Sequence, residues 1–167
     1  KQIPIGQFQW RIDERLGTVI EAENNDTVVH NFQNFNQTDG YTGQYTILGN
    51  LGSPRINRIF MNREEADNFI FVQPFSHFRN SLTDFRFTNT KSPITNLAYH
   101  KLGSNQRGED RLRAYFATNI NKLTGIGFKL DYLYGRGYYN SQQNSMFGAS
   151  VYGYHRGERY NMHAYFN

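Results

Sequence analysis

Residues 111–134 read RLRAYFATNINKLTGIGFKLDYLY, and this stretch decides the fold. From Leu112 to Ile120, and again from Ile126 to Tyr134, every second side chain is mostly apolar, while charged, small and polar residues fill most positions between. Successive side chains of a strand point to opposite faces of its sheet. The pattern therefore predicts two strands, each with one apolar and one polar face, joined by a turn at residues 121–123.

The same alternation continues on both sides of this stretch. Further segments that fit strands are residues 69–72, 84–88, 96–100, 147–152 and 159–166. The first of these is apolar on both faces, and the second follows the pattern less cleanly. We therefore interpret residues 69–167 as an antiparallel meander of about seven strands, which makes the fold class all-β.

Residues 1–68 lack this regularity. A hairpin is expected over residues 8–22, and one short turn of helix over residues 62–69. The rest of the segment is loop-like, with a glycine-bearing turn cluster at residues 49–54. We interpret residues 1–68 as an extended, mostly irregular segment that precedes the strands.

Composition narrows the class of protein. The chain has 167 residues, a length that suits one domain, and its 16% of aromatic residues argues against disorder. It contains no cysteine, which excludes disulfide frameworks, cysteine-based zinc sites and thiol catalysis. No apolar run approaches the roughly 18 residues of a membrane-spanning helix. The net charge of +4 is spread along the chain and decides nothing about partners.

Two architectures could use strands of this kind, a water-soluble sandwich or a transmembrane barrel. The strands approach the roughly 9–11 residues that a tilted spanning strand needs. Long connections (102–108 and 135–145) alternate with short ones (121–123 and 155–158), as in outer-membrane barrels. Six Tyr residues also fall toward strand ends, where a membrane interface would lie, namely Tyr132, Tyr134, Tyr152, Tyr154, Tyr160 and Tyr165. These features favour the barrel.

If the strands cross a membrane, the alternation determines which face of the sheet contacts lipid and which lines the lumen. Reversing the faces would place several Arg and Lys side chains in lipid, at roughly 2–4 kcal/mol for each one near the midplane. The residues expected to face lipid are Phe85, Phe87, Leu97, Tyr99, Leu112, Ala114, Phe116, Ile126, Phe128, Leu130, Phe147, Val151, Tyr160, Met162 and Phe166. The residues expected to line the lumen are Asp84, Arg86, Asn96, His100, Arg111, Arg113, Asn119, Lys129, Asp131, Arg159, Asn161 and His163.

Short motifs also occur in a fixed order along the chain. They are TGQ at 42–44, LGNLGSP at 48–54, FIF at 69–71, PF at 74–75, PITNLAY at 93–99, TNIN at 118–121, GF at 127–128, DY at 131–132, RGYY at 136–139, RY at 159–160 and HAYF at 163–166. Together they resemble the putative porin family of Bacteroidetes outer membranes, in Gram-negative cells. The resemblance covers roughly residues 40–167, and its strength lies in the order of the motifs.

The resemblance implies an outer-membrane β-barrel. Seven strands are fewer than the roughly eight that close a barrel, so we expect this chain to be the N-terminal part of a larger one. Residues 1–68 would then be periplasmic or would fill the lumen. Lipid would surround the strands, other outer-membrane subunits are candidate partners, and small solutes would pass if the lumen is open. The family offers no catalytic residues to carry over.

Other chemistries find little support. The turn cluster at 49–55 lacks the Gly-Lys-Ser/Thr ending of a phosphate loop. The five His residues show no metal-ligand spacing, the acidic pairs are sequence neighbours that point to opposite sides of a strand, and no Gly-x-Ser-x-Gly elbow is present. Arg and aromatic residues lie mostly on opposite faces, which disfavours binding of nucleic acid. We therefore expect no enzyme, cofactor or metal.

Two functions remain. The first is an outer-membrane barrel that passes small solutes by diffusion, with a mild preference for anions, or that scaffolds a membrane complex. Its lumen could instead be plugged, with Asp131 pairing across strands with Arg113 or Arg159. The second is a soluble β-sandwich or surface adhesin that binds carbohydrate through exposed Tyr residues.

Overall fold

The computed structural model describes residues 7–13, 15–21, 44–47, 49–63, 71, 73–78, 85–103, 108–137, 139 and 141–167. Within these ranges the secondary structure consists of β-strands and two short 3-10 helices. Every strand pair is antiparallel, which confirms the all-β, antiparallel class.

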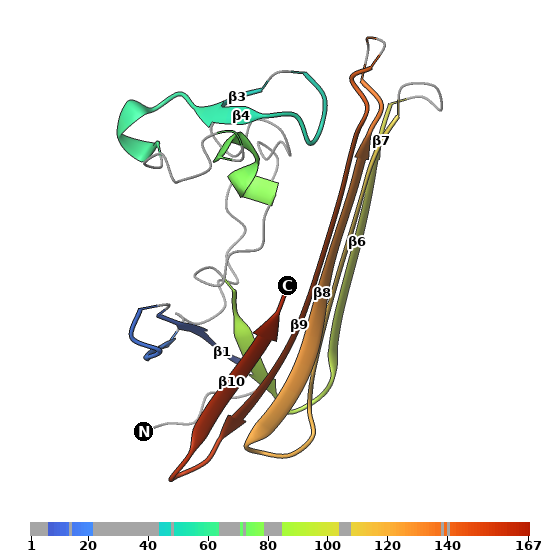
Figure 1. Cartoon of the computed structure of the whole chain (residues 1–167). Helices are drawn as coiled ribbons and strands as arrows, with labels where there is room; N and C mark the ends of the chain where they lie inside the picture. The colour runs from blue at the N-terminus through green and yellow to red at the C-terminus, as the bar shows by residue number, and fades with distance from the viewer. Residues whose placement is uncertain are drawn as a thin grey trace.

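The largest unit is a five-stranded meander in the order β10-β9-β8-β7-β6. Its strands are β6 (Ile94–Leu102), β7 (Glu109–Asn119), β8 (Thr124–Gly135), β9 (Asn144–Arg156) and β10 (Asn161–Phe166). All five fall where the sequence alternation predicts strands. The first four begin two or three residues before the predicted bounds, and β10 begins two residues after them. The long strands stand side by side in Figure 1.

The connections within the meander alternate in length. Residues 103–108 and 136–143 form long connections, and residues 120–123 and 157–160 form short ones. The strand ends that flank the two long connections lie at one end of the sheet, and the two short turns lie at the other (Figure 1). In the first short turn, the Asn121 side chain accepts hydrogen bonds from the backbone N–H groups of Leu123 and Thr124, each at 2.8 Å, which stabilises the turn.

A second, three-stranded sheet has the order β2-β1-β5. Its strands are β1 (Gln7–Ile12), β2 (Val19–Glu21) and β5 (Phe87–Thr90). The predicted hairpin over residues 8–22 is confirmed. In its turn, the Asp13 carboxylate accepts hydrogen bonds from the backbone N–H groups of Leu16 and Arg15, and these bonds hold the pKa of Asp13 below its usual range.

The partner of β5 differs from the expected one. The meander interpretation places this segment beside β6, but β5 pairs with β1, with Phe87 opposite Trp10. After residues 91–93 the chain turns and enters β6. Burial explains the difference, because Phe85 and Phe87 are almost fully buried against the five-stranded sheet and could not be covered at its edge.

Residues 44–63 form a small separate hairpin. Strand β3 (Tyr45–Ile47) pairs with β4 (Arg55–Asn57), with the predicted turn cluster between them, and a 3-10 helix (Phe60–Asn62) follows. The two strands fall in a segment predicted as loop. The predicted helical turn at 62–69 lies almost wholly outside the described residues.

The segment after this hairpin also departs from its prediction. Most of the predicted strand at 69–72 lies outside the described residues. The next described element is a 3-10 helix (Gln73–Phe78). It contains Pro74, which cannot donate a ladder hydrogen bond and so disfavours a continuing strand.

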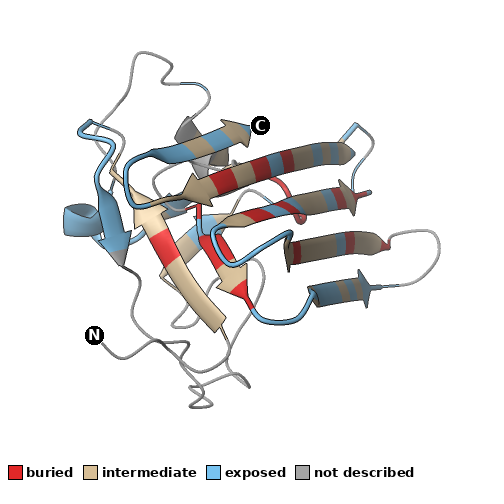
Figure 2. Ribbon diagram, turned by 90° about the horizontal axis from the view of Figure 1, so that it is seen from below, coloured by how far each residue is buried: buried red, intermediate tan, exposed pale blue. Residues whose placement is uncertain are grey.

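All the elements that precede β6 lie on one side of the five-stranded sheet (Figure 1). We call the face that they contact the inner face and the opposite one the outer face. Buried and exposed residues alternate along the strands in Figure 2, as expected when one face is covered and the other is not.

Candidate functional site

The inner face carries most of the residues that the sequence analysis assigned to a lumen. Strand register and alternation place nine of them there, namely Asn96, His100, Arg111, Arg113, Asn119, Lys129, Asp131, Asn161 and His163. Arg86 is exposed outside the sheet, and Arg159 is exposed in the turn before β10. Asp84 lies outside the described residues.

A charged patch occupies the part of the inner face nearer the long connections. The Arg111 guanidinium donates two hydrogen bonds to the Asp131 carboxylate, from Nε to Oδ1 at 3.0 Å and from Nη2 to Oδ2 at 2.7 Å. Arg113, which faces Asp131 directly in the register, instead lies 3.5 Å from the His100 ring nitrogen. Asp131 therefore pairs across strands with Arg111 and not with the expected Arg113 or Arg159, and the Arg111 guanidinium binds both carboxylate oxygens.

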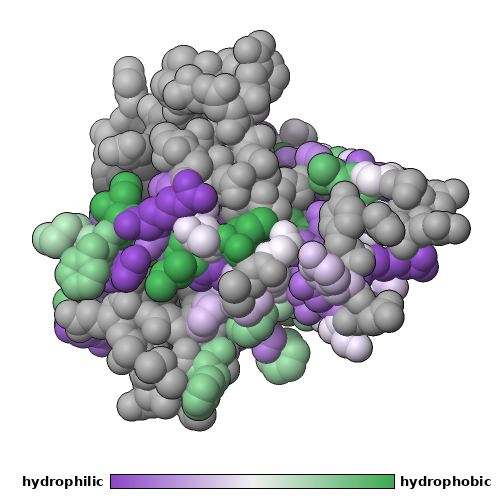
Figure 3. Space-filling view, turned by 90° about the horizontal axis from the view of Figure 1, so that it is seen from above, coloured by the Kyte–Doolittle hydropathy of each residue, from purple (hydrophilic) through white to green (hydrophobic). Residues whose placement is uncertain are grey.

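Residues of the N-terminal half cover this face at the end with the long connections. The Leu51 backbone N–H donates to Glu109 Oε1 at 2.9 Å, and the Asn50 amide donates to the Gln142 carbonyl at 2.8 Å. Gly135 permits this approach, since a Cβ there would lie 2.6 Å from the Leu51 carbonyl oxygen. Figure 3 looks down on this end and shows hydrophilic side chains mixed with hydrophobic ones.

Arg55 lies in the same covering segment. Its guanidinium carbon is 3.9 Å from the centre of the Tyr45 ring, and the side chain is almost fully buried. Burial and, to a smaller extent, the charge of Arg111 together lower the pKa of Arg55 to about 10. The inner face therefore holds positive charge in a largely dry environment at this end.

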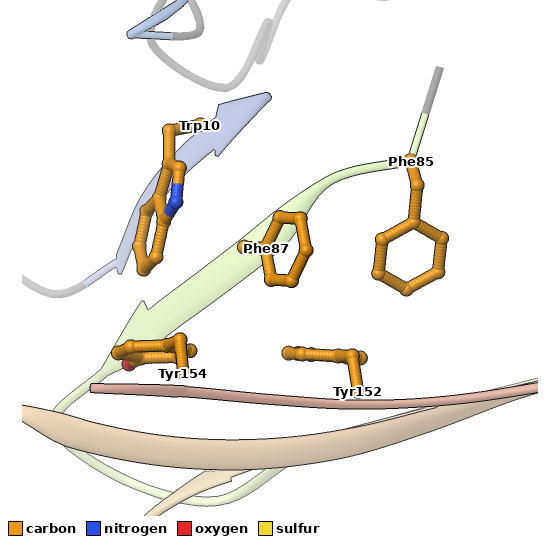
Figure 4. Packing of buried hydrophobic residues seen from close by; sticks show 5 residues of the cluster. All are labelled: Trp10, Phe85, Phe87, Tyr152 and Tyr154. Atoms are coloured by element: carbon orange, nitrogen blue, oxygen red, sulfur yellow. The ribbon is translucent and has the colours of Figure 1, made fainter. Parts of the chain in front are cut away.

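An aromatic cluster occupies the other half of the inner face, nearer the short turns. Trp10, Phe85 and Phe87 stand over Tyr152 and Tyr154 of β9, as Figure 4 shows. Trp10 meets Tyr154 edge to face with ring centres 4.7 Å apart, and Phe87 meets Tyr152 in the same way at 5.4 Å. This geometry is favourable for aromatic pairs.

Two glycines of β8 make room for the tyrosine rings. Gly125 and Gly127 pair directly with Tyr154 and Tyr152 in the register. A Cβ at either glycine would approach the facing ring to about 2.5 Å, so any larger residue would displace it. The tyrosines therefore lie across the neighbouring strand, in the manner of aromatic residues that cover cross-strand glycines.

Hydrogen bonds satisfy the polar atoms of the cluster. The hydroxyl of Tyr115 contacts both the Thr88 hydroxyl and the Tyr152 hydroxyl, the latter at 3.0 Å. The Tyr154 hydroxyl donates to Asn119 Oδ1 at 2.9 Å. A buried hydroxyl without such a partner would be costly, so these bonds fix the aromatic rings in place.

The outer face is apolar and bare. Of the fifteen residues expected to face lipid, twelve lie on it and Tyr160 is exposed in the adjoining turn. Leu97, Phe147 and Phe166 are 68%, 71% and 77% exposed. The only Asp, Glu, Lys or Arg residues on this face of the described strands are Lys101 and Asp110, both beside the long connections.

Phe85 and Phe87 do not fit the expected assignment. Both are buried in the aromatic cluster on the inner side, because β5 folds over the sheet rather than extending it. Tyr152 and Tyr154 also differ from expectation, since they lie in this cluster and not at an exposed strand end.

Sequence reasoning missed the aromatic cluster as a unit. Trp10 was seen only as part of a hairpin, and nothing in the alternation connects it with residues more than 140 positions later. The signal that could have revealed part of the cluster is the pairing of Gly125 and Gly127 with two tyrosines, which becomes visible once the β8–β9 register is known.

Other sites find no support in the part of the chain that the structure describes. No group of three or more His, Asp or Glu side chains there is arranged to hold a metal ion. Among the same residues, none of the helices has the length and hydropathy needed to traverse a bilayer.

Comparison with known proteins assigns the family. No curated protein and no solved structure shows a significant match to the chain. A family model described as "Putative porin" matches residues 7–167, which is nearly the whole chain and includes both the aromatic cluster and the five-stranded sheet. The chain therefore belongs to the putative porin family.

Proposed function

We propose that the five-stranded sheet forms part of the wall of an outer-membrane β-barrel through which small solutes diffuse. The observation that carries this proposal is the contrast between its faces. The outer face exposes large apolar side chains in a band without charged residues, whereas the inner face carries Arg111, Arg113, Lys129 and Asp131. A soluble protein rarely exposes so continuous an apolar surface, but lipid requires one.

The strand lengths support the same proposal. Strand β8 has 12 residues and rises about 3.3 Å per residue, which gives a length of roughly 36 Å. A tilt of about 40° reduces its height to roughly 28 Å, close to the apolar band of outer-membrane barrels at about 25 Å.

The edges of the sheet indicate where the wall would continue. Within the described residues, β6 pairs only with β7 and β10 pairs only with β9. Unpaired backbone groups in lipid cost several kcal/mol each, so both edges need partners in a membrane. Five strands are also fewer than the roughly eight of the smallest barrels. We propose that further strands, from this protein or from another outer-membrane subunit, pair with these edges.

The inner face would set selectivity and would perform no covalent chemistry. Arg111 is neutralised by Asp131, whereas Arg113 adds positive charge to the wall at mid-height. This balance supports a mild preference for anions. The N-terminal residues that cover both ends of the inner face would narrow the path.

Fractionation tests the membrane assignment. The full-length protein should pellet with membranes, resist carbonate extraction, and migrate differently on gels before and after heating. A protein that stays soluble without detergent would contradict the proposal and would favour the carbohydrate-binding module instead.

Conductance tests the transport role. In planar bilayers, Arg113→Gln should lower the preference for anions, whereas Lys122→Gln, which removes the same charge from an exposed short turn, should change it less. Equal effects would assign the preference to net charge alone. Silence of a correctly folded wild-type protein would contradict diffusion and favour a scaffold.

A further inference from the structure

The β1–β2 hairpin is attached to the rest of the molecule differently from β5. Strand β5 is joined to β6 by residues 91–93 only, and Phe87 of β5 is buried together with Phe85 just before it. The hairpin is connected to the wall through pairing of β1 with β5 over four positions and through side-chain contacts. The chain therefore holds β5 in place, whereas the hairpin depends on noncovalent contacts.

The most buried of those contacts belong to one side chain. Trp10 is 0% exposed, and it is the only residue of β1 that is fully buried. It packs edge to face on Tyr154 and lies against Phe87, while the Arg156 guanidinium is 4.8 Å from its ring centre. Figure 4 shows its ring directed from β1 toward the sheet. Trp10 is thus the most deeply buried anchor of the hairpin.

One hydrogen bond gives this contact its specificity. The indole Nε1–H of Trp10 donates to Nε2 of His163 at 3.1 Å. Tryptophan is a donor only, so His163 must present an unprotonated nitrogen there. Strand β10, which supplies His163, is the short edge strand of the sheet. The bond therefore connects β1 to β10, the first and the last of the described strands, across the inner face.

We propose that the β1–β2 hairpin is a removable cover of the inner face, which docks through Trp10 and His163 and uncovers Tyr154 when it leaves. The inference rests on the proposed function in one respect, that the inner face is the interior of a barrel. Departure of the hairpin would widen the aqueous path at the end with the short turns. The five-stranded wall and β5 would stay in place.

Trp10 is also the reporter, because it is the only tryptophan in the chain. With the hairpin docked, acrylamide in water should quench its fluorescence poorly. His163→Ala removes both the acceptor and part of the packing, and local opening should then raise the quenching constant at least about threefold. His163→Gln keeps an acceptor oxygen and should raise it less. His155→Ala, on the outer face of β9, is the matched control and should leave the constant unchanged.

A reversible lock separates departure of the hairpin from general loosening. The native chain has no cysteine, and Phe8 and Asn89 are directly paired neighbours on β1 and β5. Cross-strand neighbours of this kind are close enough for a disulfide. The double variant Phe8→Cys/Asn89→Cys is added to His163→Ala. When the disulfide is oxidised, the quenching constant of Trp10 should return to the wild-type value, and when it is reduced, the constant should rise again.

Three outcomes would contradict the proposal that the hairpin is a removable cover. Trp10 could be quenched as readily in the wild type as in His163→Ala, the variant could leave quenching unchanged, or the oxidised lock could fail to restore protection. Gel migration before and after heating confirms that each variant is folded. Because quenching can be measured in detergent, it reports on the cover even if fractionation contradicts the membrane assignment.

Discussion

The two faces of the five-stranded sheet differ in what their side chains contact, although the same strands form both. On the inner face, several polar groups have particular partners, as Arg111 has Asp131 and the Tyr115 hydroxyl has that of Tyr152. On the outer face, side chains such as Leu97 and Phe147 extend from the sheet with little contact. The inner face therefore depends on particular partners and the outer face on a general medium, so the faces should respond differently to substitution.

The largest effect is expected from a charge on the outer face. Val151 lies there opposite Phe128, well away from both ends of β9. In lipid, Val151→Lys should destabilise the folded protein by about 2–4 kcal/mol relative to Val151→Met, which has a similar length and no charge. Unfolding by urea in phospholipid vesicles measures the difference. A difference below about 0.5 kcal/mol would mean that water bathes this face.

Loss of the inner ion pair should have a somewhat smaller effect. Asp131→Asn removes the charge that Arg111 grips with two hydrogen bonds and should cost about 1.5–3 kcal/mol. Asp110→Asn, on the outer face beside a long connection, should change stability by about 0.5 kcal/mol or less. If Asp131→Asn and Asp110→Asn change the free energy of unfolding equally in urea, the ion pair of the inner face does not contribute more than an exposed carboxylate.

Glycine substitutions compare the two faces by volume alone. Gly127→Ala would place a Cβ about 2.5 Å from the Tyr152 ring and the Phe116 carbonyl, and overpacking of this kind costs roughly 1–3 kcal/mol. Gly153→Ala, on the outer face, meets nothing closer than 3.8 Å and should be neutral or slightly stabilising. Thermal unfolding of the two variants checks the order, and the opposite order would contradict the glycine account.

The smallest effect is expected from Asp13, in the turn of the β1–β2 hairpin that we propose as a cover. The folded-state pKa of Asp13 lies below its usual value of 3.8, so its stabilisation of the β1–β2 turn is present above that value and is lost as pH falls through the lowered pKa. Asp13→Ala should abolish this dependence. The difference in Trp10 quenching between Asp13→Ala and the wild type should shrink below about pH 4. Other titrating groups are the same in both proteins and therefore do not affect this difference. If the difference stays constant as pH falls, the hydrogen bonds of the Asp13 carboxylate do not stabilise the hairpin.

The sequence predicts much of the sheet and little of what covers it. Period-two alternation locates β6 to β10 because a strand with unlike faces must alternate, and it groups Arg111 with Asp131 on one face. Alternation does not identify the partner of a strand. Strand β5 was therefore placed in the meander, although it pairs with β1, nearly 80 residues earlier.

The errors at single residues have the same origin. Phe85 and Phe87 share a face, but their alternation cannot tell whether lipid or another part of the chain contacts that face. Tyr152 and Tyr154 were assigned by their position near a strand end, whereas cross-strand glycines decide their orientation. These contacts depend on register and on residues far away in the chain, which local sequence does not encode.

The central claim is that lipid contacts the outer face and that the inner face is shielded from it. Quenching by lipids brominated on their acyl chains tests this most directly, with the native Trp10 as the inner reporter and Phe128→Trp in a Trp10→Phe background as the outer one. We predict that the outer tryptophan loses most of its fluorescence while Trp10 keeps nearly all of it. Equal quenching of the two tryptophans, or none at position 128 in a protein inserted in vesicles, would contradict the account.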